Sequence, residues 1–392
     1  MRFLFATGMA SSPWGGSEEL WSQTAQRLKI LGHDVMALAP DWRPRPPKIC
    51  ELSAAGIPVA HYPVAPGLVR RTMDAVRRRV LKRHVRSGKQ TVLHRFLRCF
   101  RPDLVCISHG AIACGIEFME ICQEHGLPYV SIAQANAESL WPDDSLAERL
   151  GAAFLGAAQN FFVSETNLSL LECQVGCKLP NSEIVRNPCN VRQDFVPDWP
   201  DDAPVTRLAC VGRLDPSAKG QDLVLRLLSS PPWNEAPLRV SFYGTGRMES
   251  ALKRLANTLG VDPKVEFCGH VSDVAGIWKK NHALILPSRY EGLPLAIVEA
   301  MLCGRPVITT EVAGNAEFIS DGETGFVAAA PTLALLSDAM ARAWRRRKDW
   351  PAIGAAAAVL IRQKIPADPA LVFAQRLLDL AKKNGHGKSA PR

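Results

Sequence analysis

The stretch "ALILPSRYEGLPLAIVEAMLCGRPVITT", residues 283–310, contains two apolar segments on either side of a segment of helical composition. Residues 283–288 and 306–310 are short and rich in Leu, Ile and Val. Continuously apolar strands are typical of parallel sheets that are covered on both faces, because a solvent-exposed face would show alternating polar residues. A strand, a helix and a second strand in this order predict a βαβ unit.

The same alternation of strand and helix patterns runs through the whole chain. Helix candidates such as 17–31 and 247–259 separate the apolar segments. The expected strands of the first half are 2–7, 34–39, 103–108, 129–133 and 160–165, and those of the second half are 207–212, 239–244, 265–269, 283–288 and 306–310. The sequence therefore predicts an α/β protein with two doubly wound domains.

The predicted boundary between the domains lies in "EIVRNPCNVRQDFVPDWPDDAP", residues 183–204. Four prolines and four aspartates gather there between strand patterns, which is typical of a linker. We predict a first domain over 1–190 and a second over 191–365. Residues 366–392 form a final helix that packs back on the first domain, followed by a tail.

The composition is that of a soluble globular protein, with 47% hydrophobic and 22% charged residues. No apolar run is long enough for a membrane-spanning helix. "MRFLFATGMA" is predicted to be a buried strand rather than a signal peptide, because its apolar run ends at Gly8. The 11 cysteines show no CxxC pairs, which favours reduced thiols in a cytoplasmic protein and disfavours a zinc site.

A strongly basic segment spans residues 69–101. Asp74 is its only acid, and apolar residues alternate with the arginines and lysines. A solvated helical face and a surface that contacts an anionic membrane or acceptor are both consistent with this pattern. The second interpretation predicts peripheral association with the inner face of the membrane. Nucleic-acid binding is disfavoured because no recognition module accompanies the charge.

The opening stretch contains two carboxylates in unusual places. Pro294 is expected at the start of a helix, so the free N–H groups of Leu295 and its successor would form an anion site. Glu299 lies within that apolar helix and needs partners, since a buried unpaired carboxylate costs several kcal/mol. It could form a structural ion pair with an arginine, or it could accept bonds from two neighbouring hydroxyls such as those of a ribose. Glu291, before the helix, can reach other hydroxyls of a ligand.

The loop in "CVGRLDPSAKGQDLVL", residues 210–225, offers two cations after a strand. Arg213 and Lys219 stand on either side of a turn before the next helix. A forked donor and a point charge together suit a diphosphate. In open α/β sheets ligands bind at the carboxyl ends of strands, and this loop lies at such an end.

The first half contributes a glycine-rich loop and a histidine. Gly15 and Gly16 allow close approach of the backbone to a ligand, and Ser17 is expected to cap the following helix. This is not a GxGxxG fingerprint, which disfavours a nicotinamide enzyme. His109 directly follows a predicted strand, where a structural and a functional role are equally open.

Together these elements resemble the retaining glycosyltransferases of family 4, which have the GT-B fold of two facing Rossmann-like domains with a cleft between them. The resemblance covers nearly the whole chain and is strongest over 205–327. "EGLPLAIVEA" is similar to the E-x7-E signature of that family, and "GRLDPSAKG" to its phosphate loop. "GNAEFISDGETGFV", residues 314–327, is similar to the segment that closes the region in many members, and "GGSEE" to its first-domain glycine loop.

The resemblance implies a role for each of these residues. Arg213 and Lys219 would hold the donor diphosphate, Glu299 the ribose and Glu291 the donated sugar, with His109 near the reacting centre. The other implied donor-binding residues are Gly15, Gly16, Gly244, Gly246, Gly269, His270, Val271, Leu293, Pro294 and Leu295. No metal and no cofactor are expected, because the two cations and the helix N-terminus would stabilise the leaving diphosphate.

The donor and acceptor remain open at this level. A UDP-sugar is favoured because UDP is the commonest donor nucleotide of the family, and a GDP-sugar is the alternative. The acceptor would be a glycan, a lipid-linked sugar or another hydroxyl compound. Competing interpretations are a GT-B epimerase, which would need acids in the first domain, a phosphorylase, whose pyridoxal lysine motif is missing, and a non-catalytic sugar-binding protein.

Overall fold

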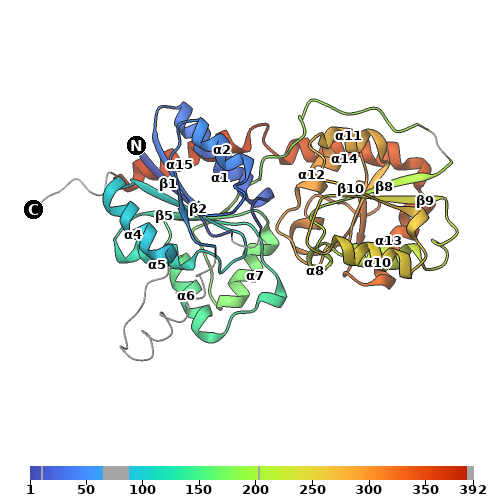
Figure 1. The fold of residues 1–392 in the computed structure, drawn as a ribbon, viewed down its shortest axis with the longest axis horizontal. Coiled ribbons are helices and arrows are strands. Elements are labelled where there is room, and N and C mark those ends of the chain that lie inside the picture. Colours follow the sequence, from blue (N-terminus) through green and yellow to red (C-terminus); the bar gives the residue numbers. More distant parts are fainter. Residues whose placement is uncertain (10–11, 65–87, 202–203, 386–392) are drawn as a thin grey trace, which may run out of the picture. The chain divides into compact units, whose positions relative to one another are not determined.

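A computed structural model describes residues 1–9, 12–64, 88–201 and 204–385, and the chain divides into two compact units. The first unit comprises Met1–Asn187 together with the segment from Asp368 onward, and the second comprises Pro188–Ala367. The second unit is therefore one continuous segment, whereas the first is built from two separate parts of the chain (Figure 1).

The first unit contains a parallel sheet of seven strands in the order β3-β2-β1-β4-β5-β6-β7. The strands are β1 (Arg2–Thr7), β2 (Asp34–Pro40), β3 (Val59–Tyr62), β4 (Leu104–His109), β5 (Tyr129–Ala133), β6 (Gln159–Phe162) and β7 (Ser182–Ile184). The reversal of strand order between β1 and β4 is the doubly wound arrangement, which brings loops together at the carboxyl edge.

Helices cover both faces of this sheet (Figure 1). One core cluster joins the sheet to α1 (Glu19–Ile30), α2 (Pro47–Ala54) and α15 (Pro369–Gly385). The other joins it to α4 (Gly88–Phe100), α5 (Ile116–Glu124), α6 (Asp144–Leu155) and α7 (Glu165–Val175). Phe161 of β6 meets Phe373 of α15 edge-on, with ring centroids 4.8 Å apart.

The second unit contains a parallel sheet of six strands in the order β10-β9-β8-β11-β12-β13. The strands are β8 (Thr206–Val211), β9 (Leu238–Tyr243), β10 (Val265–Gly269), β11 (Ala283–Leu286), β12 (Val307–Thr310) and β13 (Gly325–Ala328). Its helices are α8 (Pro216–Lys219), α9 (Gln221–Leu228), α10 (Glu249–Thr258), α11 (Val274–Lys280), α12 (Leu295–Leu302), α13 (Leu333–Arg345) and α14 (Trp350–Lys364). The predicted pair of doubly wound parallel α/β domains is thus confirmed.

Short 3-10 turns lie at Gly16–Glu18, Glu138–Leu140, Asp262–Lys264, Ala313–Ala316 and Arg347–Asp349. The first of these corrects the expected cap of α1. Gly15 is the N-cap of the turn, no side chain caps α1, and Ser17 Oγ points to Met9 Sδ at 3.8 Å.

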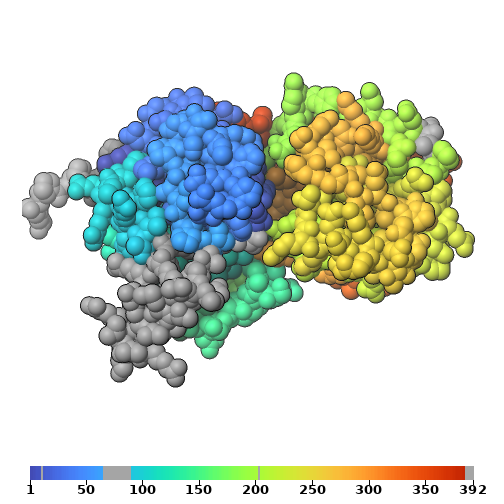
Figure 2. Space-filling model, viewed as in Figure 1, coloured from blue at the N-terminus to red at the C-terminus, as the bar shows by residue number. Residues whose placement is uncertain are grey.

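No helix in the described ranges is long and apolar enough to cross a membrane. The part of the basic segment from 69 to 87 lies outside the described residues. Its remainder forms α4, which buries Leu93 and Leu97 in the core of the first unit. Figure 2 shows atoms from the start of the chain, in blue, covering much of the visible face of the first unit, and yellow to orange atoms covering that of the second.

Candidate functional site

The carboxyl edge of the second sheet brings two glycine-rich loops into backbone contact. Leu214 N donates a hydrogen bond to Thr245 O at 3.0 Å, and Gly244 N donates to Gly269 O at 2.7 Å. Gly244 has φ +132°, and a Cβ there would lie 2.1 Å from Gly212 O. The segment after β8 and the predicted Gly244–Gly246 turn are therefore held together by close packing that only glycine permits.

Arg213 and Lys219 both line this edge. Gly212 has φ +157°, and a Cβ on it would lie 3.5 Å from Cδ of Lys219, so the lysine stem lies over the strand end next to Arg213. The Arg213 side chain is 40% exposed, and its Nη2 lies 3.4 Å from Asp215 Oδ2. Lys219 is the last residue of the one-turn helix α8 and has only 19% of its side chain exposed.

Lys219 forms an ion pair with Glu291, the first acid of the opening stretch. Lys219 Nζ lies 2.5 Å from Glu291 Oε1, and Ser288 Oγ donates a hydrogen bond to the same oxygen at 2.8 Å. Ser288 is fully buried two residues after the end of β11, and Glu291 is 6% exposed. The structure thus brings together two of the predicted site residues, with the serine hydroxyl orienting the carboxylate.

Helix α12 begins directly after this loop. Pro294 is its N-cap, in an extended conformation, and the helix starts at Leu295 with no capping side chain. Leu293 is buried, and Gly314 N donates to Gly292 O at 2.7 Å, which fixes the chain before the helix. The first N–H groups of a helix have no intrahelical partner, so this end can interact with negative charge.

Glu299 is 3% exposed on α12, and Asn190 is a partner that the sequence did not indicate. The backbone N–H and the side-chain amide of Asn190 both donate to Glu299 Oε1, at 3.0 and 2.9 Å. Asn190 lies in the segment that leads into β8, so Glu299 also anchors the start of the second unit. Two amide donors compensate part of the cost of burying the carboxylate.

The remaining predicted donor-binding residues of the second unit follow β10. Gly269 ends that strand with φ +68°, His270 is exposed, and Val271 is half-buried. Stacking of Phe267 on Phe242, with ring centroids 5.1 Å apart, packs this strand end against β9. The three residues lie on the same edge as Gly244, which the hydrogen bond to Gly269 O joins to them.

His109 lies in the first unit and is fully buried at the end of β4. Its ring stacks on Phe154 of α6, with centroids 5.7 Å apart, and a Cβ on Gly115 would lie 2.9 Å from Nδ1. Burial lowers the pKa of His109 to about 4, so the imidazole is neutral at pH 7. The ring is therefore shielded from solvent in this structure.

Glu18 connects the glycine loop of the first unit to its sheet through hydrogen bonds. The sequence did not indicate this role of Glu18. Thr7 Oγ1 donates to Glu18 Oε1 at 3.0 Å, and Trp21 Nε1 donates to Oε2 at 2.7 Å. Glu18 is 3% exposed, and burial raises its pKa to about 7. The tandem acids after Gly16 were the only sequence signal for this network, because Thr7 and Trp21 are ordinary residues of a strand and a helix.

Comparison with known proteins shows similarity to glycosyltransferases. Residues 205–346 match the family model of the glycosyl transferases group 1. The chain is 26% identical over 319 residues to glycogen synthase of Mycobacterium tuberculosis, which covers 75% of this chain and 72% of that protein. It is 39% identical over 90 residues to the Vi polysaccharide biosynthesis protein VipC/TviE of Salmonella typhi, 23% of this chain and 15% of that protein.

A solved structure of similar fold is Anabaena Alr3699/HepE in complex with UDP and glucose. It superposes with a TM-score of 0.75 at 16% identity, over 97% of this chain and 99% of that chain. Residues 205–346 are therefore similar to the glycosyl transferases group 1, and the chain has the two-sheet GT-B fold.

Proposed function

We propose that the protein is a retaining glycosyltransferase of family 4. It transfers a sugar from a nucleotide-sugar, with a UDP-sugar favoured, to a hydroxyl group of a glycan or lipid-linked acceptor in polysaccharide or glycoconjugate synthesis. The observation that carries this proposal is the Lys219–Glu291 ion pair beside Arg213 at the carboxyl edge of the second sheet. UDP and glucose in the Anabaena structure, and the polysaccharide role in the name of the Salmonella protein, support it.

The two cations serve the leaving group in this mechanism. Cleavage between the anomeric carbon and the diphosphate oxygen leaves negative charge on the phosphate. Arg213, Lys219 and the N-terminus of α12 offer positive charge to it, in the place where other enzymes use a metal ion. Each such group typically contributes about 3–4 kcal/mol to transition-state stabilisation.

Donor binding exchanges partners in the Lys219–Glu291 pair. Lys219 turns to the diphosphate, and Glu291, still held by Ser288, accepts bonds from the hydroxyls of the transferred sugar. The acceptor oxygen then bonds to the anomeric carbon on the face that the diphosphate leaves, and the acceptor proton passes to the leaving phosphate oxygen. This front-face step retains the anomeric configuration and needs no protein nucleophile.

Glu299 recognises the ribose in this proposal. Asn190 fixes Oε1 of Glu299 through two amide donors, which sets the orientation of the carboxylate on the helix. Gly244, Gly246 and the 267–271 segment then lie on the edge where the nucleobase would pack. Gly15 and Gly16 would supply backbone N–H groups from the first unit.

Donor turnover by Lys219→Ala is the decisive experiment. We expect kcat with UDP-sugars to fall about 100- to 1,000-fold, because one preorganised charge is removed from the leaving group. Lys348→Ala is the matched control, since Lys348 is an exposed lysine of the same unit, away from the carboxyl edge of the sheet in the turn Arg347–Asp349. Full donor turnover in Lys219→Ala would show that the assigned site is wrong.

The basic segment 69–101 supports a proposed peripheral contact with an anionic membrane at the cytoplasmic face. Because α4 buries its apolar side chains, the proposal rests on 69–87. Neutralising Arg77, Arg78 and Arg79 should weaken the binding free energy to anionic vesicles by about 1 kcal/mol per charge. Co-sedimentation with the vesicles measures this binding. Unchanged sedimentation would remove the membrane contact and leave the glycosyltransferase proposal intact.

A further inference from the structure

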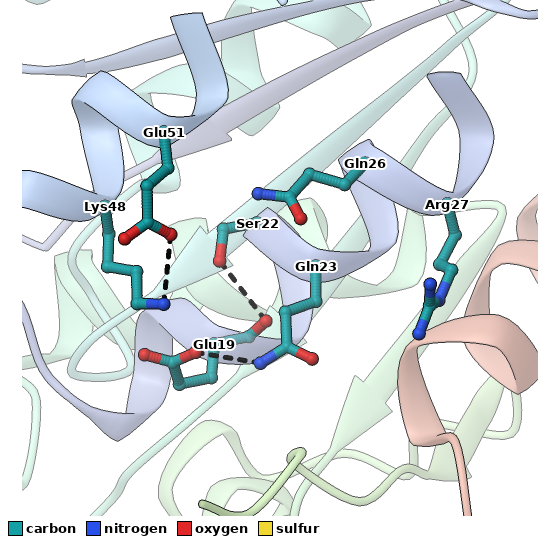
Figure 3. Close-up of a pocket in the computed structure, with 7 residues that line it drawn as sticks. All are labelled: Glu19, Ser22, Gln23, Gln26, Arg27, Lys48 and Glu51. Carbon is teal, nitrogen blue, oxygen red and sulfur yellow. Dashed lines mark hydrogen bonds and ion pairs between the residues drawn. The ribbon is translucent and has the colours of Figure 1, made fainter. Parts of the chain in front are cut away.

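The first unit contains a polar hollow between α1 and α2 (Figure 3). Its volume is about 150 Å³. Every side chain that lines it is polar or charged: Glu19, Ser22, Gln23, Gln26, Arg27, Lys48 and Glu51. Pockets for drug-sized ligands are larger, at about 300–1,000 Å³, and mostly apolar. A small ligand rich in hydrogen-bonding groups suits this hollow better.

A buried carboxylate forms one wall of the hollow. Glu19 is 7% exposed, and its Oε1 accepts a hydrogen bond from Trp14 Nε1 at 2.7 Å. Gln23 Nε2 donates to Oε2 at 2.9 Å, so both oxygens are held in place (Figure 3). A carboxylate oxygen can accept about two hydrogen bonds, which leaves acceptor capacity on each oxygen for a ligand hydroxyl.

The charges of the hollow favour a neutral ligand. Two acids, Glu19 and Glu51, balance two bases, Arg27 and Lys48. Both bases already have acidic partners, because Lys48 Nζ lies 3.0 Å from Glu51 Oε2 and Arg27 Nη2 lies 2.8 Å from Asp368 Oδ2. A phosphate or a carboxylate would have to break one of these pairs. A neutral polyol would not.

The glutamine amides complete a set of groups that suits sugar hydroxyls. Gln23 and Gln26 each carry an amide that donates and accepts hydrogen bonds, and both line the hollow. The volume holds several water molecules, which one sugar ring could displace. Glu19 is the first residue of α1 and directly follows the turn Gly16–Glu18, so the hollow begins next to the glycine loop.

We propose that this hollow binds one neutral sugar unit of the acceptor. The proposal rests on the glycosyltransferase function, since it assigns an acceptor subsite for that reaction. Glu19 and the amides of Gln23 and Gln26 receive the hydroxyls, while Lys48 and Glu51 of α2 form the opposite wall.

Binding of methyl glycosides to the full chain tests the proposal. The probes are the methyl α-glycosides of glucose, galactose, mannose and N-acetylglucosamine, measured by saturation-transfer NMR without nucleotide and again with UDP at saturation. We expect saturable binding of at least one probe. Gln26→Ala should weaken it by about two- to tenfold, as expected for the loss of one hydrogen bond, and leave the Kd of UDP unchanged.

Gln375→Ala is the matched control, because Gln375 is an exposed glutamine of α15 in the same unit. Equal probe binding by the Gln26→Ala variant and the native chain, or no saturable binding of any probe, would overturn the proposal. Displacement of the probe by inorganic phosphate would also overturn it, since the ligand would then be anionic. Absence of UDP binding would count against the glycosyltransferase function alone, because probe binding is measured independently.

Discussion

Buried carboxylates have different environments at the scale of single residues. One oxygen of Glu291 accepts hydrogen bonds from Lys219 and Ser288. One oxygen of Glu299 accepts two hydrogen bonds from amides of Asn190. Glu18 accepts hydrogen bonds from a hydroxyl and from an indole N–H. Burial raises the pKa of Glu18 to about 7, because the hydrogen bonds from Trp21 and Thr7 offset only part of the burial effect. The charge of Glu18 therefore changes near physiological pH.

The raised pKa of Glu18 makes the stability of the first unit depend on pH. The unfolded chain loses this proton near pH 4.5 and the folded chain near pH 7, so ionisation opposes folding increasingly as the pH rises between these values. Relative to the native chain, Glu18→Gln should gain stability from pH 4.5 to above 7, by at most about 3 kcal/mol. Urea unfolding at pH 5 and pH 8 measures this. A constant stability difference would contradict the shifted pKa.

Glu299→Ala should weaken UDP binding about ten- to a hundredfold, because the ribose would lose charge-assisted hydrogen bonds worth about 1.5–3 kcal/mol. Isothermal titration with UDP measures the effect. Glu266→Ala provides the control, since Glu266 is an exposed acid on β10 of the same unit. If both variants bound UDP like the native chain, Glu299 would have only its structural role with Asn190.

At the scale of elements, the loops at the carboxyl edge of the second sheet act as one packed layer. Gly212, Gly244 and Gly246 bring two backbone segments close together, where a Cβ at Gly246 would lie 2.2 Å from Leu214 O. The position of Arg213 therefore depends on residues more than thirty positions away in the chain. A substitution in one loop should therefore shift the backbone of the other loop.

Gly244→Ala should destabilise the chain by more than the left-handed conformation alone requires. The added Cβ would lie 2.1 Å from Gly212 O, whereas Gly260, with φ +67°, has no heavy atom within 4 Å. Gly260→Ala thus isolates the conformational cost of about 1–2 kcal/mol. Urea unfolding should give a larger loss for Gly244→Ala, together with weaker UDP binding. Equal losses would show that the contact between the loops is not tight.

The sequence predicted most elements but not their shortest members. Long apolar runs such as "ALILPS" identified the central strands within one or two residues. β3, β7 and β13 were missed because each has only three or four residues and contains polar residues or glycine. Glu291, Glu299, Arg213 and Lys219 could be singled out from local context. Their partners Asn190 and Ser288, and the network of Glu18, depend on tertiary contacts that spacing does not reveal.

At the scale of the whole molecule, most residues of the proposed donor site belong to the second unit, which is continuous in sequence. A ligand that binds only the folded state raises the midpoint of thermal unfolding. The expected contacts of Arg213 and Lys219 with the diphosphate make the phosphates the main source of affinity. The size of the shift should therefore follow the number of phosphates on the nucleotide.

Thermal unfolding of the full chain should show a larger shift with UDP than with UMP, and the smallest with uridine. At a concentration of one hundred times Kd, the stabilisation is about 2.7 kcal/mol. Differential scanning calorimetry at equal nucleotide concentration measures the order. An equal shift with uridine and UDP would contradict the diphosphate site, and Lys219→Ala should reduce the UDP shift toward that of UMP.

The division of the first unit into two parts of the chain has a consequence for how the protein is made. Helix α15 supplies Phe373 to the core of the first unit, yet it follows the whole second unit in the sequence. A ribosome therefore releases all seven strands of the first sheet long before α15, which covers part of one face beside α1 and α2. During translation the second unit can fold as a completed segment, while part of one apolar face of the first unit is still uncovered. Chaperone contact with the nascent chain should accordingly concentrate on residues of the first unit and end when α15 emerges.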